Sequence, residues 1–520
     1  MSCNHRWLLP VALAACPTLA EAQCIAQDLV PAPPLPEFSQ LGQSVAFDGQ
    51  TIAVGHTFVP APSGEIGLVN LFGPGSGGLW IPTATVPGPA TDPQSWFGRA
   101  VAVDGRWLAV GAPMESGTLP NSGAVYVYQL IGGQPVFFEK LRSTGRQLGR
   151  SLALEGGRLL AGGDDAAHVF ELGPNGWIAT QDLFAPPSPG AAEFGASVTL
   201  DGDTLAVGSP WFDAGPSLGQ GNVGSVRLYD RVAGQWQFTQ QFEGELAQGN
   251  FGQSVSLSGE RLAVGAYRGG AGAIGASHTG AAFVFDRSGG AWVQQQKLLP
   301  SDSAPGDDFG WSVDLEGDRL LVGGIKSSGP GRAFVFDLVG STWSEQQVVE
   351  PLALDGNGFG VAVAQSSGRC VVGSFSKSTR TQLLQQGEPL FACPDSISVA
   401  SGGRQDLFVD GGAASAGLIY LVLGSASGTS PGIPLGGFLL PLVADGYFQL
   451  TLSEPSSGPL AGTLGVLDGS GFATAGVQVP AGLSPALVGV QLSHAACVLD
   501  PAGPPVVTLV SDAASLQLLP

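Results

Sequence analysis

The sequence has little charge and no basic run. Only 12% of the 520 residues are charged, and 42 acidic against 21 basic residues give a formal net charge of −21. A negative chain repels phosphate backbones, so we expect no nucleic-acid partner. Few Lys, Glu and Arg are present for the polar faces of long helices. Beyond the N-terminal segment no apolar run reaches about 18 residues, so no transmembrane segment is predicted.

The sequence also lacks the usual signs of catalysis or metal binding. The five histidines show no metal-ligand spacing, and no Gly-x-Ser-x-Gly motif occurs. A Ser-His-Asp triad stays open, because its members can lie far apart in a chain. Two Gly-x-Gly-x-x-Gly matches, at 219–224 and 270–275, have no helix predicted after them, and we interpret them as flexible loop glycines. We therefore predict no catalytic residues, no metal ligands and no cofactor.

The first 22 residues resemble an export signal. Arg6 precedes an apolar stretch at 7–15, and the Ala-Glu-Ala at 20–22 fits a small-x-small cleavage site. This pattern predicts a signal peptide over 1–22 and a secreted, cell-surface or periplasmic protein. The alternative is a lipobox at 13–16, in which Cys16 would be lipidated and would anchor the chain.

Cysteine is scarce in the mature chain. Cleavage after Ala22 leaves Cys24, Cys370, Cys393 and Cys497, without the Cys-x-x-Cys spacing of a metal site. So few cysteines do not make a disulfide scaffold, but one structural disulfide suits an oxidising compartment. Cys370 replaces a leucine of the repeat described below, so we predict a buried small hydrophobe there.

Glycine, proline and apolar residues are abundant instead. There are 80 glycines and 39 prolines, and 44% of the residues are hydrophobic. A disordered chain lacks such an apolar fraction, because it cannot bury enough surface to offset the ordering entropy. Many short strands joined by tight turns account for both features. We therefore expect an all-β protein.

One motif recurs through most of the chain. A clear copy is FGRAVAVDGRWLAVGAP at 97–113, and FGASVTLDGDTLAVGSP at 194–210 follows the same pattern. Alternation predicts a first strand, Asp-Gly supplies a two-residue hairpin turn, and a second strand follows. The seven copies begin at Leu41, Phe97, Leu148, Phe194, Phe251, Phe309 and Phe359.

Two further strands complete each repeat. Segments such as 123–128 predict a third strand, and the fourth carries a recurring tryptophan that packing within the blades explains. Four antiparallel strands about every 50 residues are typical of a propeller blade, so the copies predict a seven-bladed β-propeller over 23–392. The recurring tryptophans are Trp80, Trp177, Trp236, Trp292 and Trp343.

The N-terminal segment indicates how the ring closes. The Gln-Asp-Leu at 27–29 matches the Gln-Asp-Leu at 181–183, which lies in a fourth strand. The last repeat has no clear fourth strand, so we expect residues 25–30 to supply the outer strand of the last blade and to remove an open edge. Cys24 and Cys393 flank this junction and are the predicted disulfide.

The repeated motif resembles the FG-GAP repeat of integrin α-chain propellers and of many secreted bacterial proteins. The resemblance covers about residues 24–392 and implies a propeller, but the family is functionally broad. Integrin-type repeats often insert a calcium loop between the first two strands. Here a two-residue hairpin leaves no room for the six to eight oxygens that calcium takes, so these calcium sites are not carried over. We interpret the acidic cluster of Asp302, Asp307 and Asp308 as solvated loop carboxylates.

The repeat stops near residue 376 and a different pattern follows. Short alternating segments punctuated by Gly and Pro predict a β-sandwich domain of about eight strands over 393–520. This region looks like a tail domain of secreted multi-domain bacterial proteins, and the resemblance implies no activity. The predicted strands include 407–409, 418–423, 447–452, 464–467, 473–479, 487–492 and 506–510.

The candidate binding residues are those that the repeat does not explain. In a propeller, the loops between strands two and three emerge on the same face as the loops between blades. Aromatic side chains beside polar groups are a common composition of recognition patches. The alternative is that they pack their own loops. Trp107 and Trp311 lie within strands and are predicted to be core residues. The candidates are Trp96, Trp211, Phe212, Asp213, Tyr267, Arg268 and His278, with His56 on the same face.

These observations predict an exported, monomeric, non-catalytic binding or adhesion protein that recognises an extracellular protein or polysaccharide. This prediction depends partly on fold analogy. One alternative is a structural cell-envelope protein without a discrete ligand. Another is a propeller hydrolase or lyase with a site on the loop face. An exposed aromatic patch would favour binding, and a cluster of carboxylates or histidines would favour catalysis.

Overall fold

A computed structural model shows a chain whose regular structure is almost entirely β-strand. Seven sheets of four strands form the N-terminal part; a further four-stranded sheet, a larger sheet and a two-stranded sheet form the C-terminal part. The prediction of an all-β propeller followed by a sandwich is confirmed. The structure describes residues 25–519 except 33–41, 62–63, 75–79, 90–91, 93, 118, 186–192, 214–220, 247, 270–278, 303–305, 327–328, 352–357, 367, 375–380, 386–389, 394–395, 401, 411–414, 416, 436–437, 458–459, 468–471, 501–505 and 512–513.

The first four blades follow the chain, each with its innermost strand first. Blade 1 contains β2 (Ser44–Phe47), β3 (Ile52–Ala61), β4 (Gly64–Pro74) and β5 (Trp80–Pro87). Blade 2 contains β6 (Val101–Asp104), β7 (Trp107–Ala112), β8 (Ala124–Ile131) and β9 (Gln134–Leu141). Blade 3 contains β10 (Ser151–Glu155), β11 (Arg158–Gly162), β12 (Ala166–Gly173) and β13 (Gly176–Phe184). Blade 4 contains β14 (Ser197–Asp201), β15 (Thr204–Ser209), β16 (Ser225–Val232) and β17 (Gln235–Glu243).

The remaining blades have the same plan, with one strand supplied from the N-terminus. Blade 5 contains β18 (Ser254–Ser258), β19 (Arg261–Ala266), β20 (Ala281–Ser288) and β21 (Ala291–Leu298). Blade 6 contains β22 (Phe309–Glu316), β23 (Arg319–Gly324), β24 (Arg332–Val339) and β25 (Thr342–Val349). Blade 7 contains β26 (Phe359–Ser366), β27 (Arg369–Ser374), β28 (Gln382–Gln385) and β1 (Ile25–Asp28).

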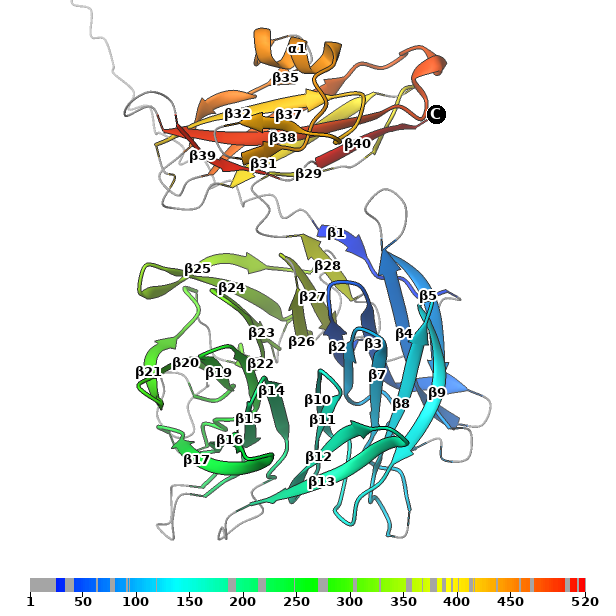
Figure 1. Ribbon diagram of the computed structural model, residues 1–520, viewed down its shortest axis with the longest axis vertical. Coiled ribbons are helices and arrows are strands. Elements are labelled where there is room, and N and C mark those ends of the chain that lie inside the picture. Colours follow the sequence, from blue (N-terminus) through cyan, green and yellow to red (C-terminus); the bar gives the residue numbers. More distant parts are fainter. Residues whose placement is uncertain are drawn as a thin grey trace, which may run out of the picture.

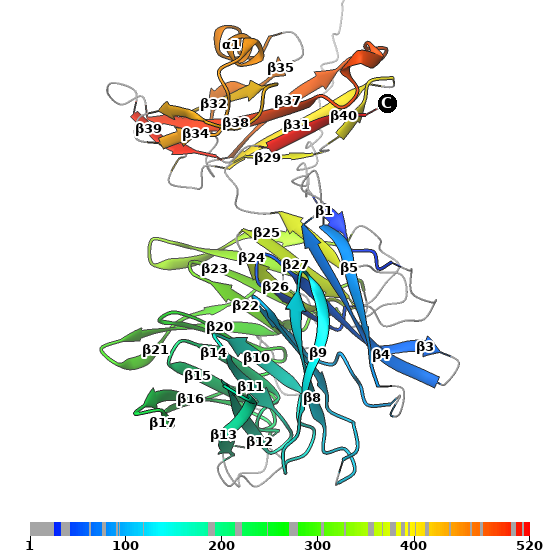
Figure 2. The same ribbon diagram turned by 45° about the vertical axis from the view of Figure 1, so that its right-hand side comes forward.

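The ring closes between blades 7 and 1. Strand β1 pairs antiparallel with β28 and so forms the outer edge of blade 7. The inner strands contact their neighbours around the whole ring, and β26 contacts β2. Figures 1 and 2 show the blades following one another around the ring, with β1 beside β28. Cys24 lies outside the described residues, so its disulfide with Cys393 stays a prediction.

The Phe-Gly pair forms the turn that leads into each inner strand. In blade 2 the Arg99 N–H donates to the carbonyl of Trp96 at 3.0 Å, and Gly98 has a φ of 84°. A type II turn requires a positive φ at its third residue, which glycine adopts without steric cost. A Cβ at Gly98 would also lie 2.8 Å from the carbonyl oxygen of Leu68. The turn and the close approach together explain the glycine of the motif.

Side chains of the repeat bond each blade to the next. Ser44 Oγ donates to the carbonyl of Gly98 at 2.8 Å, and the equivalent Ser197 donates to Gly252. On the outer strands one glutamine amide both donates to and accepts from the backbone of the next recurring tryptophan. These pairs are Gln27 with Trp80, Gln181 with Trp236, Gln240 with Trp292, and Gln296 with Trp343.

The hydrophobic core lies between neighbouring blades. Phe97 of blade 2 is fully buried and packs with Val69 and Leu71 of blade 1. Burying a phenylalanine contributes about 1.5–3 kcal/mol, so each repeat adds a similar increment to the ring. The recurring tryptophans are 3–5% exposed, which confirms their role in blade packing. Cys370 is also buried, 1% exposed, as its place in the repeat predicts.

A buried carboxylate holds the loop between β7 and β8. Glu115 is 3% exposed and accepts a hydrogen bond from the Tyr126 hydroxyl at 2.6 Å. It is also ion-paired with Lys140 and Arg142 of the outer strand and its end. A buried charge is stable only when it is paired and hydrogen bonded, and these contacts meet that need.

The C-terminal domain consists of two packed sheets. Their shared core includes Leu407 and Val477 of one sheet and Val422, Val498 and Leu516 of the other. Both views show this domain beyond the edge of the ring that contains β1 and β28 (Figures 1 and 2). The first sheet contains β29 (Leu390–Cys393), β31 (Gly403–Asp410), β37 (Phe472–Val479) and β35 (Leu460–Ala461). The second contains β30 (Ser396–Ser398), β40 (Ala514–Leu519), β38 (Gln491–Asp500), β32 (Ile419–Ser425), β36 (Leu464–Val466) and β39 (Val506–Val510); β33 (Ile433–Leu435) pairs with β34 (Phe438–Leu440).

Two predicted strands of this domain are wrong. Residues 447–452 lie in the helix α1 (Gly446–Ser453), because Asp445 caps it by accepting from the Phe448 N–H at 2.8 Å. The predicted strand at 487–492 is also wrong in its first half. Pro485–Leu487 forms a 3₁₀ turn, and β38 begins only at Gln491. In the described part of the chain, no helix is long and apolar enough to span a membrane.

Candidate functional site

The inner strands place one set of side chains around the central axis. In blades 1, 3, 4, 5 and 6, the serine two residues after the glycine of the Phe-Gly or Leu-Gly pair donates to the carbonyl of the glycine in the next blade's pair. The same contact recurs from blade to blade, so the inner strands run in the same direction. Their N-terminal ends therefore meet on one face. We call the residues directly before and after each Phe-Gly or Leu-Gly pair, with the residues they contact, the FG rim. The residues after the pairs are Gln43, Arg99, Arg150, Ala196, Gln253, Trp311 and Val361.

The residues before these pairs share a strained backbone conformation. Trp96 has a φ of 56°, and Glu193 and Asp308 have φ values of 48° and 47°. A non-glycine residue in the left-handed region costs about 1–3 kcal/mol unless the surrounding structure supports it. Because the conformation recurs at one blade position, the turn into the inner strand accounts for it. The turn thereby fixes the direction of a variable side chain in successive blades.

Blades 3 and 4 contribute a charged group to the FG rim. Arg150 is ion-paired with Glu193 and, at 3.3 Å, with Asp164. Asp164 follows the second strand of blade 3, and Glu193 precedes the Phe-Gly of blade 4. All three side chains are about one-fifth to one-quarter exposed, so the group faces solvent while it is partly desolvated.

Arg99 of blade 2 lies beside this group. The pKa of its guanidinium is lowered to about 10, chiefly by burial and also by the charge of Arg150, while Glu193 opposes the change. Within the described residues no oxygen is hydrogen bonded to the Arg99 guanidinium. The FG rim therefore contains a partly buried cation beside a paired one.

Blades 5 and 6 contribute an aromatic pair. Trp311 contacts Tyr267 edge to face, with 4.8 Å between ring centroids, and Arg268 stacks over Tyr267 at 5.2 Å. Tyr267 is buried, and burial raises the pKa of its hydroxyl above the usual value. The prediction that Trp311 is a core residue is wrong, because it lies at the start of β22 on the rim and is only partly buried. Trp107, by contrast, is 6% exposed, as predicted.

Asp308 is the perturbed acid of the FG rim. Its pKa is raised to about 6, chiefly by burial; Arg268 opposes the rise, and the neighbouring Asp307 adds to it. A carboxyl group with such a pKa is partly protonated near neutral pH, which is the range in which general acids and bases work. The same shift arises in carboxyl groups with no catalytic role when they are partly buried.

The structure brings some of the predicted site residues together. Tyr267 and Arg268 lie on the FG rim, and Trp96 precedes the Phe-Gly of blade 2 and packs edge to face on Phe58 at 5.7 Å. His56 is buried and accepts a hydrogen bond from the Gly42 N–H at 3.1 Å, so it supports the turn of blade 1. His278 lies outside the described residues.

The other predicted residues fold onto their own loop. Phe212 is buried against Val223, and Asp213 accepts from the Asn222 N–H at 2.6 Å. Trp211 is 38% exposed. Phe212 therefore packs within its own loop, as the alternative interpretation predicted. Trp211 is exposed on the surface, where it could contact a ligand.

The interpretation of the acidic cluster as solvated carboxylates is wrong for Asp307. This residue is 3% exposed and is ion-paired with Lys326 and Arg332. Arg332 is also ion-paired with Asp302. A buried carboxylate requires such partners. The ion pairs could not be predicted, because both cations lie far from Asp307 in the sequence.

Arg99, Arg150 and Glu193 are site residues that sequence reasoning missed, and Trp311 is one that it assigned to the core. A signal for them exists, because they occupy the variable positions on either side of the Phe-Gly pair. Aligning the seven repeats on that pair gives one column before it and one after it. Both columns differ from blade to blade in charge and size, whereas the pair itself is Phe-Gly or Leu-Gly in every blade.

The opposite ends of the inner strands form a ring of structural contacts. The hairpin residue Asp48 accepts from the Gly105 N–H at 3.0 Å, and Asp104 accepts from Gly156 at 2.6 Å in the next blade. Nearer the middle of the strands, Asp314 accepts from Ser256 Oγ at 3.1 Å and from the Gln365 N–H at 2.7 Å. Burial raises the pKa of Asp314 to about 7. These carboxylates join neighbouring blades, and their hydrogen bonds account for their presence without a ligand.

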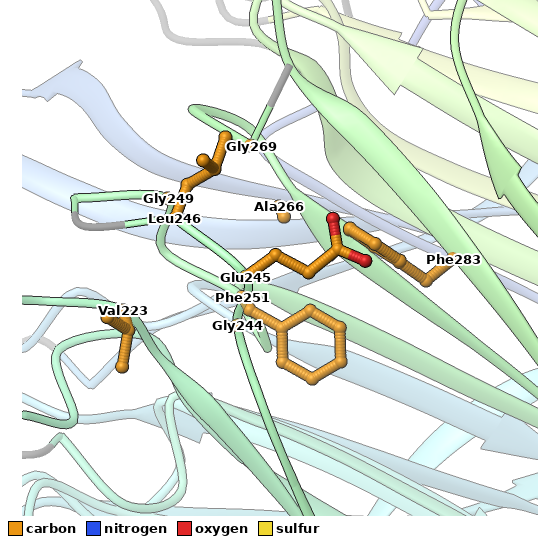
Figure 3. Close-up of a pocket in the computed structure, with 9 residues that line it drawn as sticks. All are labelled: Val223, Gly244, Glu245, Leu246, Gly249, Phe251, Ala266, Gly269 and Phe283. Atoms are coloured by element: carbon orange, nitrogen blue, oxygen red, sulfur yellow. The ribbon is translucent and has the colours of Figure 1, made fainter. Parts of the chain in front are cut away.

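A small cavity between blades 4 and 5 is too small for a ligand. Its volume of about 10 Å³ holds no more than one water molecule. Phe251 and Phe283 form part of the wall, and Glu245 is its one charged residue (Figure 3). Glu245 is ion-paired with Lys297 at 2.9 Å. The cavity therefore reflects imperfect packing rather than a binding site.

Comparison with known proteins identifies the repeat. The FG-GAP repeat family matches residues 90–128, 245–285 and 292–336. No curated protein sequence matches the chain. Similar solved structures include a provisionally assigned 6-phosphogluconolactonase from Bacteroides uniformis, at 12% identity and a TM-score of 0.41, with 65% of this chain and 88% of the other covered. Another is its provisionally assigned counterpart from Bacteroides fragilis, at 12% identity and a TM-score of 0.43, with 62% and 88% covered.

These matches agree with the architecture. The three matched segments contain strands of blades 2, 5 and 6, and each spans a Phe-Gly turn. The structure repeats the same four-stranded plan in the blades between them. The chain is a β-propeller protein that contains FG-GAP repeats.

Proposed function

We propose that the chain is an exported binding protein whose FG rim recognises an extracellular protein or polysaccharide. The observation that carries the proposal is the gathering of Arg99, Arg150, Glu193, Tyr267 and Trp311 on one face. They come from blades 2 to 6. Ring packing does not require these residue types, because Ala196 and Val361 occupy equivalent positions in other blades.

The chemistry of the rim suits recognition. Aromatic side chains offer a large rigid contact surface, and arginine adds planar hydrogen-bond donors, so both are enriched where binding energy is concentrated. The turns beneath hold these side chains in place before a ligand arrives, which lowers the entropic cost of binding. The signal-peptide pattern at 1–22 supports export to a compartment in which such ligands occur.

A hydrolase or lyase is the second candidate. It is favoured by one observation, the raised pKa of Asp308 beside Tyr267 and Arg268. An acid, a phenol and a cation in one group could serve proton transfer to a ligand held on the rim. If the chain is such an enzyme, the wild type turns over a bound ligand and Asp308→Asn abolishes that turnover. If the chain is a binding protein, the wild type itself shows no turnover.

The test is a binding screen of the purified mature chain against polysaccharides and intact cells. Trp311→Ala should abolish binding in a variant that remains folded. Loss of its contact with Tyr267 should lower the melting temperature, so binding is measured well below that temperature. Phe184→Ala is the matched control, because Phe184 is 66% exposed on the outer strand of blade 3. Binding that survives Trp311→Ala and Trp211→Ala would contradict the proposal and move the site to the C-terminal domain.

A further inference from the structure

Among the described residues, three partly buried arginines of the propeller make no ion pair: Arg227 and Arg369 lie in strands β16 and β27, whereas Arg99 lies on the FG rim. An unpaired arginine normally lies in water, where its charge is solvated. Arg99 is instead partly buried on the FG rim, and within the described chain no oxygen bonds its guanidinium. The arginines with ion pairs are Arg142, Arg150, Arg158, Arg231, Arg261, Arg287, Arg319 and Arg332.

A partly buried cation is costly unless something compensates it. Desolvation of a charged group is unfavourable, and here the charge of Arg150 adds repulsion. Arg150 is itself satisfied by Glu193 and Asp164, so it has no need of a further anion. An anionic ligand bound at Arg99 would remove both costs. The position is thus favourable for an anion and unfavourable for a second cation.

The local charge balance selects a singly charged anion. Arg99 and Arg150 carry two positive charges, and Glu193 and Asp164 carry two negative charges, so the group is neutral without a ligand. One carboxylate leaves a net charge of −1, whereas a phosphate monoester leaves about −2. The net charge of −21 on the whole chain further disfavours a polyanion. The planar guanidinium matches a carboxylate with two parallel hydrogen bonds.

The remaining FG rim suits a sugar better than a peptide. Trp311 offers a partly exposed aromatic surface, and Gln43 and Gln253 hold neutral amides at equivalent positions of other blades. Amides donate and accept hydrogen bonds, as hydroxyl groups require. A peptide side chain would need an apolar pocket, and the one cavity described above is too small and lies between blades.

The geometry points to Arg99 as the carboxylate-binding residue for a saccharide that carries a single uronic acid, with Trp311 as the surface for a sugar ring. This inference rests on the proposed function and names its ligand class. It assigns affinity for the acid form of the sugar to one side chain. The contribution is expected to be screened by salt, because the rim is open to solvent.

The test compares acid sugars with their neutral forms. A panel of oligosaccharides with one uronic acid residue, and the methyl ester of each, is titrated against wild-type protein by calorimetry. We expect an acid to bind at least tenfold more tightly than its ester. Arg99→Gln should remove this preference, and Arg99→Lys should recover only part of it. Arg106→Gln is the matched control, because Arg106 is exposed at a hairpin turn at the other end of the inner strands.

The outcomes separate this inference from the proposed function. An acid preference that persists in Arg99→Gln overturns the assignment. The wild type could instead bind neutral sugars alone, or tripeptides with a free but not an amidated C-terminus. Either result would refute a uronic acid as the ligand, while the FG rim would still be a binding surface. Failure of the wild type to bind any saccharide, peptide or cell surface overturns both. Arg99→Gln is expected to fold, since it removes a partly buried charge and breaks no hydrogen bond.

Discussion

The junction between blades 7 and 1 leads to the sharpest stability prediction. Gln27 of β1 donates to the Trp80 carbonyl and accepts from the Trp80 N–H at 2.6 Å. Each hydrogen bond contributes about 1 kcal/mol, and an unsatisfied buried group adds about 1–3 kcal/mol. Because Trp80 is 3% exposed, Gln27→Ala should lower the free energy of unfolding by about 2–4 kcal/mol.

An internal blade supplies the matched comparison. Gln240 makes the same two bonds to Trp292, at 2.8 and 2.9 Å, so Gln240→Ala should cost as much as Gln27→Ala. Gln237→Ala, on the exposed side of the same strand, should cost nothing. The assay is urea unfolding followed by tryptophan fluorescence. A midpoint unchanged by Gln27→Ala but lowered by Gln240→Ala would refute the closure of the ring through β1.

Three further predictions concern buried groups and turns. Glu115→Gln should lower stability by about 2 kcal/mol in thermal unfolding, because hydrogen bonds to charged groups contribute about 1.5–3 kcal/mol; Glu260→Gln, 72% exposed, should change nothing. The raised pKa of Asp314, about 7, means that the folded state binds its proton more tightly than the unfolded state. Stability should therefore fall as the pH rises from about 4 to 7, and Asp314→Asn should remove that slope in melting curves. Gly310→Ala should destabilise by more than 2 kcal/mol in urea unfolding, since its φ is 87° and its Cβ would lie 2.2 Å from a carbonyl oxygen. Gly105→Ala, with φ 54° and nothing within 4 Å, should cost about 1 kcal/mol.

The blades could be predicted from the sequence because the features that define each blade lie within a single repeat. Strand alternation, the Asp-Gly hairpin and the Phe-Gly turn are local features, and local features can be recognised without knowing the fold. The match between 27–29 and 181–183 had a physical basis, since Gln27 and Gln181 make the same backbone contacts in different blades.

The site could be predicted only in part. Tyr267 and Arg268 stood out because they differ from the repeat, whereas Arg99 and Arg150 lie in the turns before inner strands that resemble the others. Their proximity arises when blades 2 and 3 pack side by side, which depends on contacts between residues about 50 positions apart. The helix at 446–453 was missed because alternating residues over one segment fit a strand as well as a short capped helix, and the Asp445 cap decided between them.

The measurement that most directly tests the recognition face is hydrogen–deuterium exchange of the mature chain with and without the ligand found in the binding screen. Ligand should slow exchange at the FG rim, in the segments 96–99, 147–150, 193–196, 267–269 and 308–311. Exchange at the hairpin turns around Gly105 and Gly156, and in the C-terminal domain, should stay unchanged. Protection confined to the C-terminal domain or to the hairpin turns, with the FG rim unchanged, would contradict this account.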